Sequence, residues 1–317
     1  MSTVGCAGLL VEDSFCGPVA SLPPEGALVV LDNMPVRAGG CAANVAISLA
    51  RQGISVEVSG CVGFDSGAEV LRSAFTSARV GSSRVVAVGG PCTSKTIILL
   101  IDGQDRRYFH VIGANRSFSV EHLPISWLAT LKIFYLGGLC ALPGIDFDRL
   151  RYLLKECRDR RVTTVVDVVA PQDSKDVLGV RSLLPYVDVF VPNEDESRAI
   201  TELTDPVDQL RAFQDAGANT VIVTRGGNGC VALYRGETYS CGAYQMDVVD
   251  PSGSGDAFTS GIIASLLRGS SISDTLQYAS AMGASATRAA GTTDSVFSVQ
   301  QAQAFIAAHP LTVTRGT

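Results

Sequence analysis

The chain has 317 residues, of which 46% are hydrophobic and 18% charged, and 25 basic against 31 acidic residues give a formal net charge of −6. This length and composition are sufficient for one large α/β domain or for two smaller ones. The negative charge and the lack of a long basic run argue against an extended nucleic-acid surface, so we predict no nucleic-acid partner.

The cysteines and histidines predict neither a disulfide framework nor a zinc site. Nine cysteines and three histidines are scattered along the chain, and no Cys-x-x-Cys pair occurs. An odd number of cysteines without a framework is typical of reduced thiols in a cytoplasm. The N-terminus lacks the features of a signal peptide, and the longest apolar runs are too short to span a bilayer. The sequence therefore predicts a cytoplasmic protein with no membrane partner.

Short apolar runs alternate with helical patterns over most of the chain. Strands are predicted over residues 4–11, 54–61, 132–136, 162–168, 187–191 and 220–224. Helices are predicted over 41–51, 65–77, 146–160, 176–184, 207–216, 256–268 and 272–289, with a further helix beginning near 194, and the tail 310–317 is expected to fray. Strands that alternate with helices in this way pair in parallel. We therefore predict an α/β fold, a doubly wound, mainly parallel sheet with helices on both faces.

Two regions interrupt this alternation. Residues 28–37 form an apolar run, and the segments 94–102 and 106–112 flank the turn Gly103-Gln104-Asp105 without an intervening helix. We interpret them as a small antiparallel sheet, inserted in two pieces. The small sheet would take residues 13–37 and 93–112, and the main domain residues 1–12, 38–92 and 113–317. Such a sheet cannot form its own core, so it must pack on the main domain or on another subunit. Either arrangement would suit a lid over a cleft; a hairpin without function is the alternative.

The segment Asp250-Pro251-Ser252-Gly253-Ser254-Gly255-Asp256 runs directly into a predicted helix of small apolar residues. Its glycines allow a tight turn and a close approach of the backbone to a ligand. The start of the helix offers unpaired N–H groups and the positive end of the helix dipole, which favour an anion. Asp256 at this position is either a helix-capping residue or a carboxylate with a chemical role.

A second glycine-rich segment, Gly39-Gly40 followed by Asn44, lies between a strand-like run and a helix. The spacing differs from that of a dinucleotide-binding loop, and paired glycines before a helix instead let backbone N–H groups approach a polyol. Asn44 can both donate and accept hydrogen bonds, or it can cap the helix locally. Asp13 follows the first strand, where a carboxylate can bind neighbouring hydroxyls of a sugar, although loops often carry aspartate.

Two later segments follow strands in the same manner. Asn193 and Glu196 have the spacing of a capping box, and the same pair could lie near Mg²⁺ and nucleotide phosphates; both interpretations can hold together. The segment 224–229 contains Gly226 and Gly229, which form either a turn with backbone exposed to a phosphate or an ordinary glycine-rich hairpin. No Walker loop occurs, and no serine elbow has a credible histidine partner.

The motifs Gly39-Gly40-x-x-x-Asn44 and Asp250-x-x-Gly253-x-Gly255-Asp256, in this order, resemble the two signature regions of the PfkB family, the ribokinase-like carbohydrate kinases. The resemblance covers residues 4–300. It implies a ribokinase-like fold and transfer of the γ-phosphoryl group of ATP, with Mg²⁺, to a hydroxymethyl group of a sugar or nucleoside. It also implies that the inserted sheet is a lid, which in many members pairs two subunits as a homodimer.

The resemblance assigns a role to each motif residue. Asp256 corresponds to the general base, and the backbone N–H groups of Gly253, Ser254 and Gly255 correspond to an anion hole for the moving phosphoryl group. The residues that correspond to substrate-binding positions are Asp13, Gly39, Gly40 and Asn44. Those that correspond to the nucleotide and Mg-phosphate side are Asn193, Glu196, Thr224, Gly226 and Gly229. Those that resemble the surroundings of a monovalent cation site, for K⁺, are Asp250, Ser252, Gly291 and Ser295.

The sequence also departs from the family pattern at three places. Pro251 follows Asp250 where Thr is usual, and Ser254 stands between the glycines where Ala is usual. Gly137-Gly138-Leu139 replaces a substrate-contacting Glu of some members, which argues against ribokinase itself. We predict an ATP- and Mg²⁺-dependent sugar kinase. The alternatives are a nucleoside kinase of the same family and a non-catalytic sugar or nucleotide sensor on the same scaffold.

Overall fold

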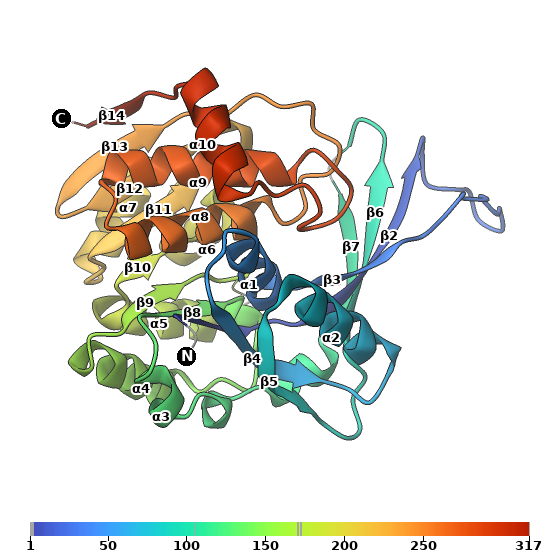
Figure 1. The fold of residues 1–317 in the computed structure, drawn as a ribbon, viewed down its shortest axis with the longest axis horizontal. Coiled ribbons are helices and arrows are strands. Elements are labelled where there is room, and N and C mark those ends of the chain that lie inside the picture. The colour runs from blue at the N-terminus through green and yellow to red at the C-terminus, as the bar shows by residue number, and fades with distance from the viewer. Residues whose placement is uncertain (1–2, 105, 170, 172, 317) are drawn as a thin grey trace.

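A ten-stranded sheet forms the centre of the computed structural model, which describes residues 3–104, 106–169, 171 and 173–316 (Figure 1). Across the sheet the described strands follow the order β14-β13-β12-β11-β10-β9-β8-β1-β4-β5. Their bounds are β1 Val4–Gly8, β4 Val56–Val62, β5 Gly81–Ala87, β8 Ile133–Gly137, β9 Thr163–Val166, β10 Val189–Phe190, β11 Thr220–Thr224, β12 Cys230–Tyr234, β13 Glu237–Cys241 and β14 Val313–Arg315.

Helices cover both faces of this sheet, and each face has its own apolar core. One core contains side chains of α1 Cys41–Arg51, α2 Ser66–Ala78, α8 Ser254–Arg268, α9 Ile272–Ala286 and α10 Val299–Ala308. The other contains side chains of α3 Ile125–Leu128, α4 Phe147–Asp159, α5 Ser174–Leu183, α6 Glu194–Thr201 and α7 Pro206–Asp215. Within the described ranges, no helix has both the length and the apolar character needed to cross a membrane.

Strand pairing is parallel from β5 to β11, as the alternation of strands and helices predicts. The doubly wound, mainly parallel fold is therefore confirmed. The edge formed by β11 to β14 is antiparallel. The prediction of a frayed tail is wrong for residues 313–316, because β14 pairs with β13 and the Gly316 N–H donates to the Thr238 carbonyl oxygen at 2.8 Å.

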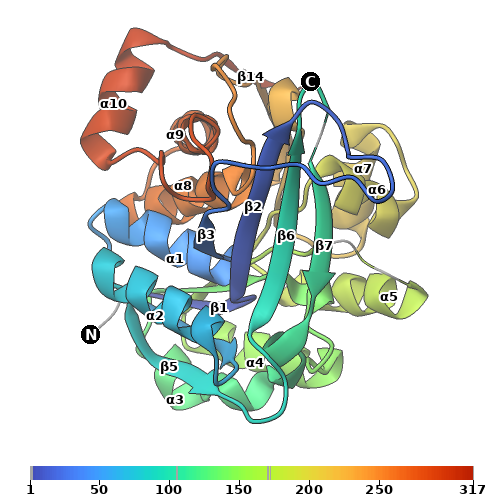
Figure 2. The same cartoon turned by 90° about the vertical axis from the view of Figure 1, so that its right-hand side faces the viewer.

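A separate four-stranded sheet stands at one side of the main body, at the right in Figure 1 and facing the viewer in Figure 2, in the order β3-β2-β6-β7. Its strands are β2 Val11–Val19, β3 Val36–Gly39, β6 Ser94–Ile101 and β7 Arg107–Val111. The structure corrects two details of the prediction. The strands β2 and β6 belong to two separate insertions into the main domain, and where these insertions lie side by side the two strands pair in parallel. Only the end of the apolar run 28–37 forms a strand, and Leu28 and Val30 are 83% and 84% exposed. Asp105 of the expected turn lies outside the described residues.

Candidate active site

The N-terminal ends of α1 and α8 meet beside the sheet, and each helix follows a glycine with positive φ. Gly40 precedes α1 with φ of 88°, and Gly253 precedes α8 with φ of 75°. A Cβ atom at Gly253 would also collide with the backbone carbonyl of Thr292. Neither helix start has a side-chain cap among the described residues. The glycine-rich motifs therefore place two uncapped helix starts next to one another.

Asn44 and Asp256 connect these two helix starts. Asn44 is 3% exposed, and its Nδ2 donates to Asp256 Oδ2 at 2.8 Å. Its Oδ1 accepts a hydrogen bond from the Thr292 hydroxyl, also at 2.8 Å. Both ends of the amide are thus fixed, and Asp256 is held in one orientation. Thr292 had not been identified from the sequence, because a single threonine in a loop carries no distinguishing pattern.

Asp13 lies in β2, and its carboxylate rests directly against Gly39. A Cβ atom at position 39 would overlap this carboxylate, so only glycine allows the contact. Asp13 is 6% exposed. Burial raises the pKa of Asp13 to about 7; a hydrogen bond with Thr96 opposes the shift, and the charges of Asp256 and Asp250 add to it. The structure therefore brings Asp13, Gly39, Gly40 and Asn44 to one place beside Asp256.

The environment of Asp256 gives its carboxyl group an unusual affinity for protons. Burial raises its pKa to about 6, although hydrogen bonds from Asn44 and Cys41 oppose the shift. A carboxylate with this pKa is ionised at neutral pH and is a better proton acceptor than an ordinary aspartate. Asp256 is thus suited to general-base chemistry.

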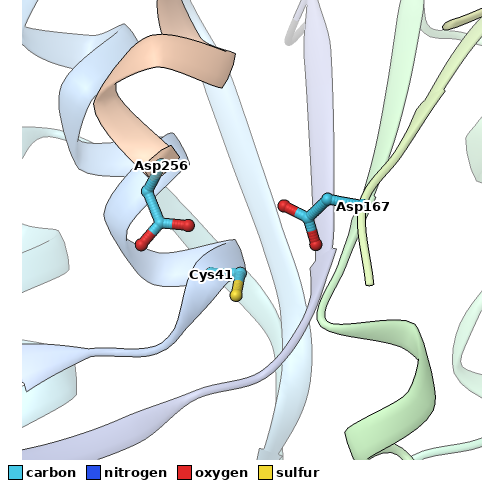
Figure 3. Close-up of side chains that lie close together, drawn as sticks. All are labelled: Cys41, Asp167 and Asp256. Carbon is cyan, nitrogen blue, oxygen red and sulfur yellow. The ribbon is translucent and has the colours of Figure 1, made fainter. Parts of the chain in front are cut away.

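Asp167 and Cys41 complete a cluster with Asp256 (Figure 3). The Cys41 sulfur and carboxylate oxygens of both aspartates all lie within 4.8 Å of one another. Burial, followed by the charge of Asp256, raises the pKa of Asp167 well above its usual range. Sequence analysis missed Asp167. Its signal was an acid at the carboxyl end of a parallel strand, where ligands of α/β proteins bind.

The start of α8, which carries Asp256, has backbone N–H groups without a hydrogen-bond partner in the described part of the chain. The described residues provide no hydrogen-bond acceptor for the N–H groups of Gly253 and Gly255. The N–H of Ser254 donates to the Pro251 carbonyl oxygen at 3.3 Å, which is a long and weak bond. Two open amides at a helix start, together with the helix dipole, are able to hold an anion.

A pocket of about 220 Å³ adjoins the start of α8 and is lined by Thr224, Gly226 and Gly229. Ser254 and Gly255, which directly precede Asp256 in the chain, also line it. The structure thus joins two motifs that are separated by some thirty residues of chain. The aromatic and apolar side chains that line the rest of the pocket had not been predicted; they include Tyr244, Met246 and Phe258.

Asn193 and Glu196 form the predicted capping box at the start of α6. Asn193 Oδ1 accepts the Glu196 N–H at 2.8 Å, and Glu196 Oε2 accepts the Asn193 N–H at the same distance. Asn193 is bridged to Thr224, at the rim of the pocket. The charge of Glu196 contributes, after burial and other charges, to the raised pKa of Cys41. Asn193 and Glu196 therefore lie near both the pocket and the cluster of Cys41, Asp167 and Asp256.

Three of the four residues expected around a monovalent cation lie together. Asp250 is fully buried, and its carboxylate accepts the N–H groups of Ser252 at 2.9 Å and Gly291 at 3.2 Å. The Ser252 hydroxyl is buried without a hydrogen-bond partner in the described part of the chain. The Ser295 hydroxyl instead donates to backbone carbonyls of α9.

The chain is similar to known proteins over most of its length. The model of the family described as pfkB family carbohydrate kinase matches residues 7–298. The chain is 23% identical over 281 residues to ribokinase from Haemophilus influenzae, covering 86% of this chain and 89% of the relative. It is 26% identical over 268 residues to adenosine kinase from Schizophyllum commune, covering 76% of each. A protein assigned as ribokinase II from E. coli, solved with ATP and Mg²⁺, has a TM-score of 0.82 at 20% identity, covering 98% of this chain and 100% of that one. The fold that the resemblance implied is confirmed.

Proposed function

Because the chain belongs to the pfkB family of carbohydrate kinases, we propose that it transfers the γ-phosphoryl group of MgATP to a hydroxymethyl group of a small sugar. Family membership makes it a phosphotransferase that acts on an alcohol; the sugar and the mechanism are the proposal. The observation that carries the proposal is the position of Asp256. It follows the open amides of α8 directly in the chain, and its carboxylate is held by Asn44.

In the proposed reaction, Asp256 accepts the proton of the attacking hydroxyl. Its raised pKa supports this role, and Asn44 keeps the carboxylate pointed at the reacting group. The amides of Gly253 and Gly255, with that of Ser254 once its weak bond is released, stabilise the charge on the moving phosphoryl group. Phosphoryl transfer needs little covalent help from the protein, so positioning and electrostatics of this kind are sufficient.

The nucleotide would occupy the pocket that contains Thr224, Gly226 and Gly229. The same pocket is lined by the aromatic side chains of Tyr244 and Phe258 and by Ser254 and Gly255 at the start of α8. It would therefore offer an apolar surface to the adenine and the open amide of Gly255 to the triphosphate. Asn193 and Glu196 would face the phosphates and hold Mg²⁺ through water, because Mg²⁺ retains several waters and uses few carboxylates. The ATP and Mg²⁺ bound to the E. coli protein support this assignment.

The acceptor would bind to Asp13, Gly39, Gly40 and Asn44. Asp13 offers a carboxylate to sugar hydroxyls, and its neighbour Gly39 leaves the backbone accessible. The four-stranded sheet would close over this place as a lid and limit hydrolysis of ATP by water.

A nucleoside acceptor is the second candidate, and one feature favours it. A cavity of about 780 Å³ lies between the four-stranded sheet and the main domain, which is large for a monosaccharide. Phe15, Leu100 and Val249 are among its apolar lining residues and could pack on a base. A panel of pentoses, hexoses, ketoses and nucleosides, assayed for ADP release with Mg²⁺, separates the two candidates. Binding of these ligands without release of ADP would instead indicate a non-catalytic sugar or nucleotide sensor.

Replacement of the proposed base gives the first test. We expect Asp256→Asn to fold normally and to lower kcat by about 10²- to 10⁴-fold, the usual contribution of acid–base catalysis. Asp274→Asn is the matched control, because Asp274 also lies in the first turn of a helix, α9, but is exposed and outside the site. Near-normal turnover of the Asp256 variant would refute its role as the base.

The pH dependence gives a second test. Below its pKa of about 6, Asp256 is protonated and cannot accept a proton, so kcat/KM for the acceptor should fall as the pH falls through this value. The hydrogen bond from Asn44 lowers the pKa of Asp256, so Asn44→Ala should move the midpoint to higher pH. ATP titrates identically in both proteins, so the difference reports on the enzyme. A midpoint that Asn44→Ala leaves unchanged would contradict the assignment.

The surroundings of Asp250 generate a prediction about K⁺. A monovalent cation held by Asp250, Ser252 and the Gly291 segment would fix the turn that presents the open amides of α8. We therefore expect kcat to be several-fold higher in KCl than in choline chloride of equal ionic strength. Equal rates in the two salts would remove the cation from the proposal.

The outer face of the lid predicts a homodimer. Val36, Ile97 and Phe109 form a continuous row across β3, β6 and β7, with Ser14 of β2 between them, and are 39%, 44% and 67% exposed. An exposed apolar sheet face of this kind is typical of a contact between subunits. By light scattering we expect a dimer that Phe109→Asp dissociates and that Leu178→Asp, on α5, leaves intact. A monomeric wild-type protein would exclude this dimer.

A further inference from the structure

Asp167 is the buried carboxyl group of the active site to which the proposed mechanism gives no role. It is 7% exposed and directly follows β9. The hydroxyl of Tyr135 donates to its Oδ2, and the N–H of Gly138 donates to its Oδ1 at 2.5 Å. These two donors approach from β8 and from the turn that follows it. They fix the carboxyl group so that it faces Asp256 and Cys41 (Figure 3).

On its open side, Asp167 faces the carboxyl group of Asp256 and the thiol of Cys41. No arginine, lysine or histidine within the described residues forms an ion pair with Asp13, Asp167 or Asp256. Two carboxyl groups that face each other this closely repel when both are ionised. Hydrogen-bond donors placed between them relieve the repulsion. An acceptor with hydroxyls on neighbouring carbons supplies such donors, and a carboxylate or phosphate at the same place would add to the repulsion.

We propose that Asp167 is a specificity-determining residue that accepts a hydrogen bond from the acceptor hydroxyl adjacent to the one that is phosphorylated. The inference rests on the proposed function, because it places the reacting hydroxyl at Asp256. Together with Asp13, Asp167 restricts the site to uncharged polyhydroxylated acceptors. It excludes acceptors that carry a carboxylate or phosphate beside the reacting carbon.

A purely structural role for Asp167 makes different predictions. If Asp167 only anchored Tyr135 and Gly138, its loss would lower stability and would affect the acceptor and MgATP alike. A residue that touches the acceptor changes the acceptor's KM more than kcat, and leaves the KM for MgATP unchanged. It also removes the penalty for deleting one particular hydroxyl of the acceptor.

The experiment compares wild type, Asp167→Asn, Asp167→Ala and Tyr135→Phe on ribose, its single-deoxy analogues, adenosine, fructose, gluconate and fructose 6-phosphate. Asp159→Asn, an exposed carboxylate at the end of α4, is the matched control. For the best uncharged acceptor, Asp167→Ala should raise KM about 10- to 100-fold, the usual effect of losing a hydrogen bond to a charged group. Asp167→Asn should also raise the activity with the anionic acceptors relative to the uncharged ones, and Tyr135→Phe should have a smaller effect in the same direction.

The outcomes separate the two claims. If wild type phosphorylates no acceptor of the panel, the proposed function fails, and this inference fails with it. If wild type is active but the Asp167 variants keep its acceptor KM, its deoxy-analogue penalties and its preference for uncharged acceptors, only this inference is overturned. If Asp167→Ala does not fold, the same comparison on Asp167→Asn decides the question, because the asparagine retains the size of the side chain and can still accept the Gly138 N–H.

Discussion

The hydrogen bond from Asn44 to Asp256 is the contact on which the site depends, and it joins residues 212 positions apart in the chain. It exists only because α1 and α8 begin side by side. Glycine at both helix starts allows this arrangement, since a side chain at Gly253 would strike the backbone near Thr292. Thr292 in turn holds the other end of the Asn44 amide. One buried amide thus fixes the direction of the carboxylate, and the loop that contains Thr292 becomes part of the proposed active site.

The same arrangement weakens the fold that contains it. The folded-state pKa values of Asp13 and Asp256 are raised to about 7 and about 6. A carboxyl group with a raised folded-state pKa has no effect on stability at pH values below its unfolded pKa of about 4. As the pH rises above that value, it opposes folding increasingly, and the full penalty is present above the folded-state pKa. Groups that lower stability at neutral pH are typical of functional sites, where proton affinity has been adjusted for chemistry.

The fold could be predicted from the sequence because its signals are local. Alternation of strands and helices was sufficient for the doubly wound sheet, and the spacing of Asn193 and Glu196 was sufficient for their capping box. What the prediction missed depends on contacts between distant segments. The parallel pairing of β2 with β6 arises from two separate excursions of the chain, and no local pattern encodes it. Asp167 was missed although it follows a parallel strand, because its position opposite Asp256 becomes visible only in the folded structure.

The site is divided by the sign of its charges, and this division agrees with the sides that the proposed function gives to the two substrates. On one side, the start of α8 and the glycines of segment 226–229 present backbone amides, which favour phosphates. On the other side, Asp13 and Asp167 present buried carboxyl groups, which bind hydroxyls, and their raised pKa values show that this place disfavours negative charge. Glu196 lies near the boundary between these two sides, close enough for its charge to contribute to the raised pKa of Cys41. A triphosphate approaching this boundary would meet a negative charge, and Mg²⁺ would neutralise it. In the proposed function, the need for the metal thus follows from the same division that would keep the nucleotide out of the acceptor position.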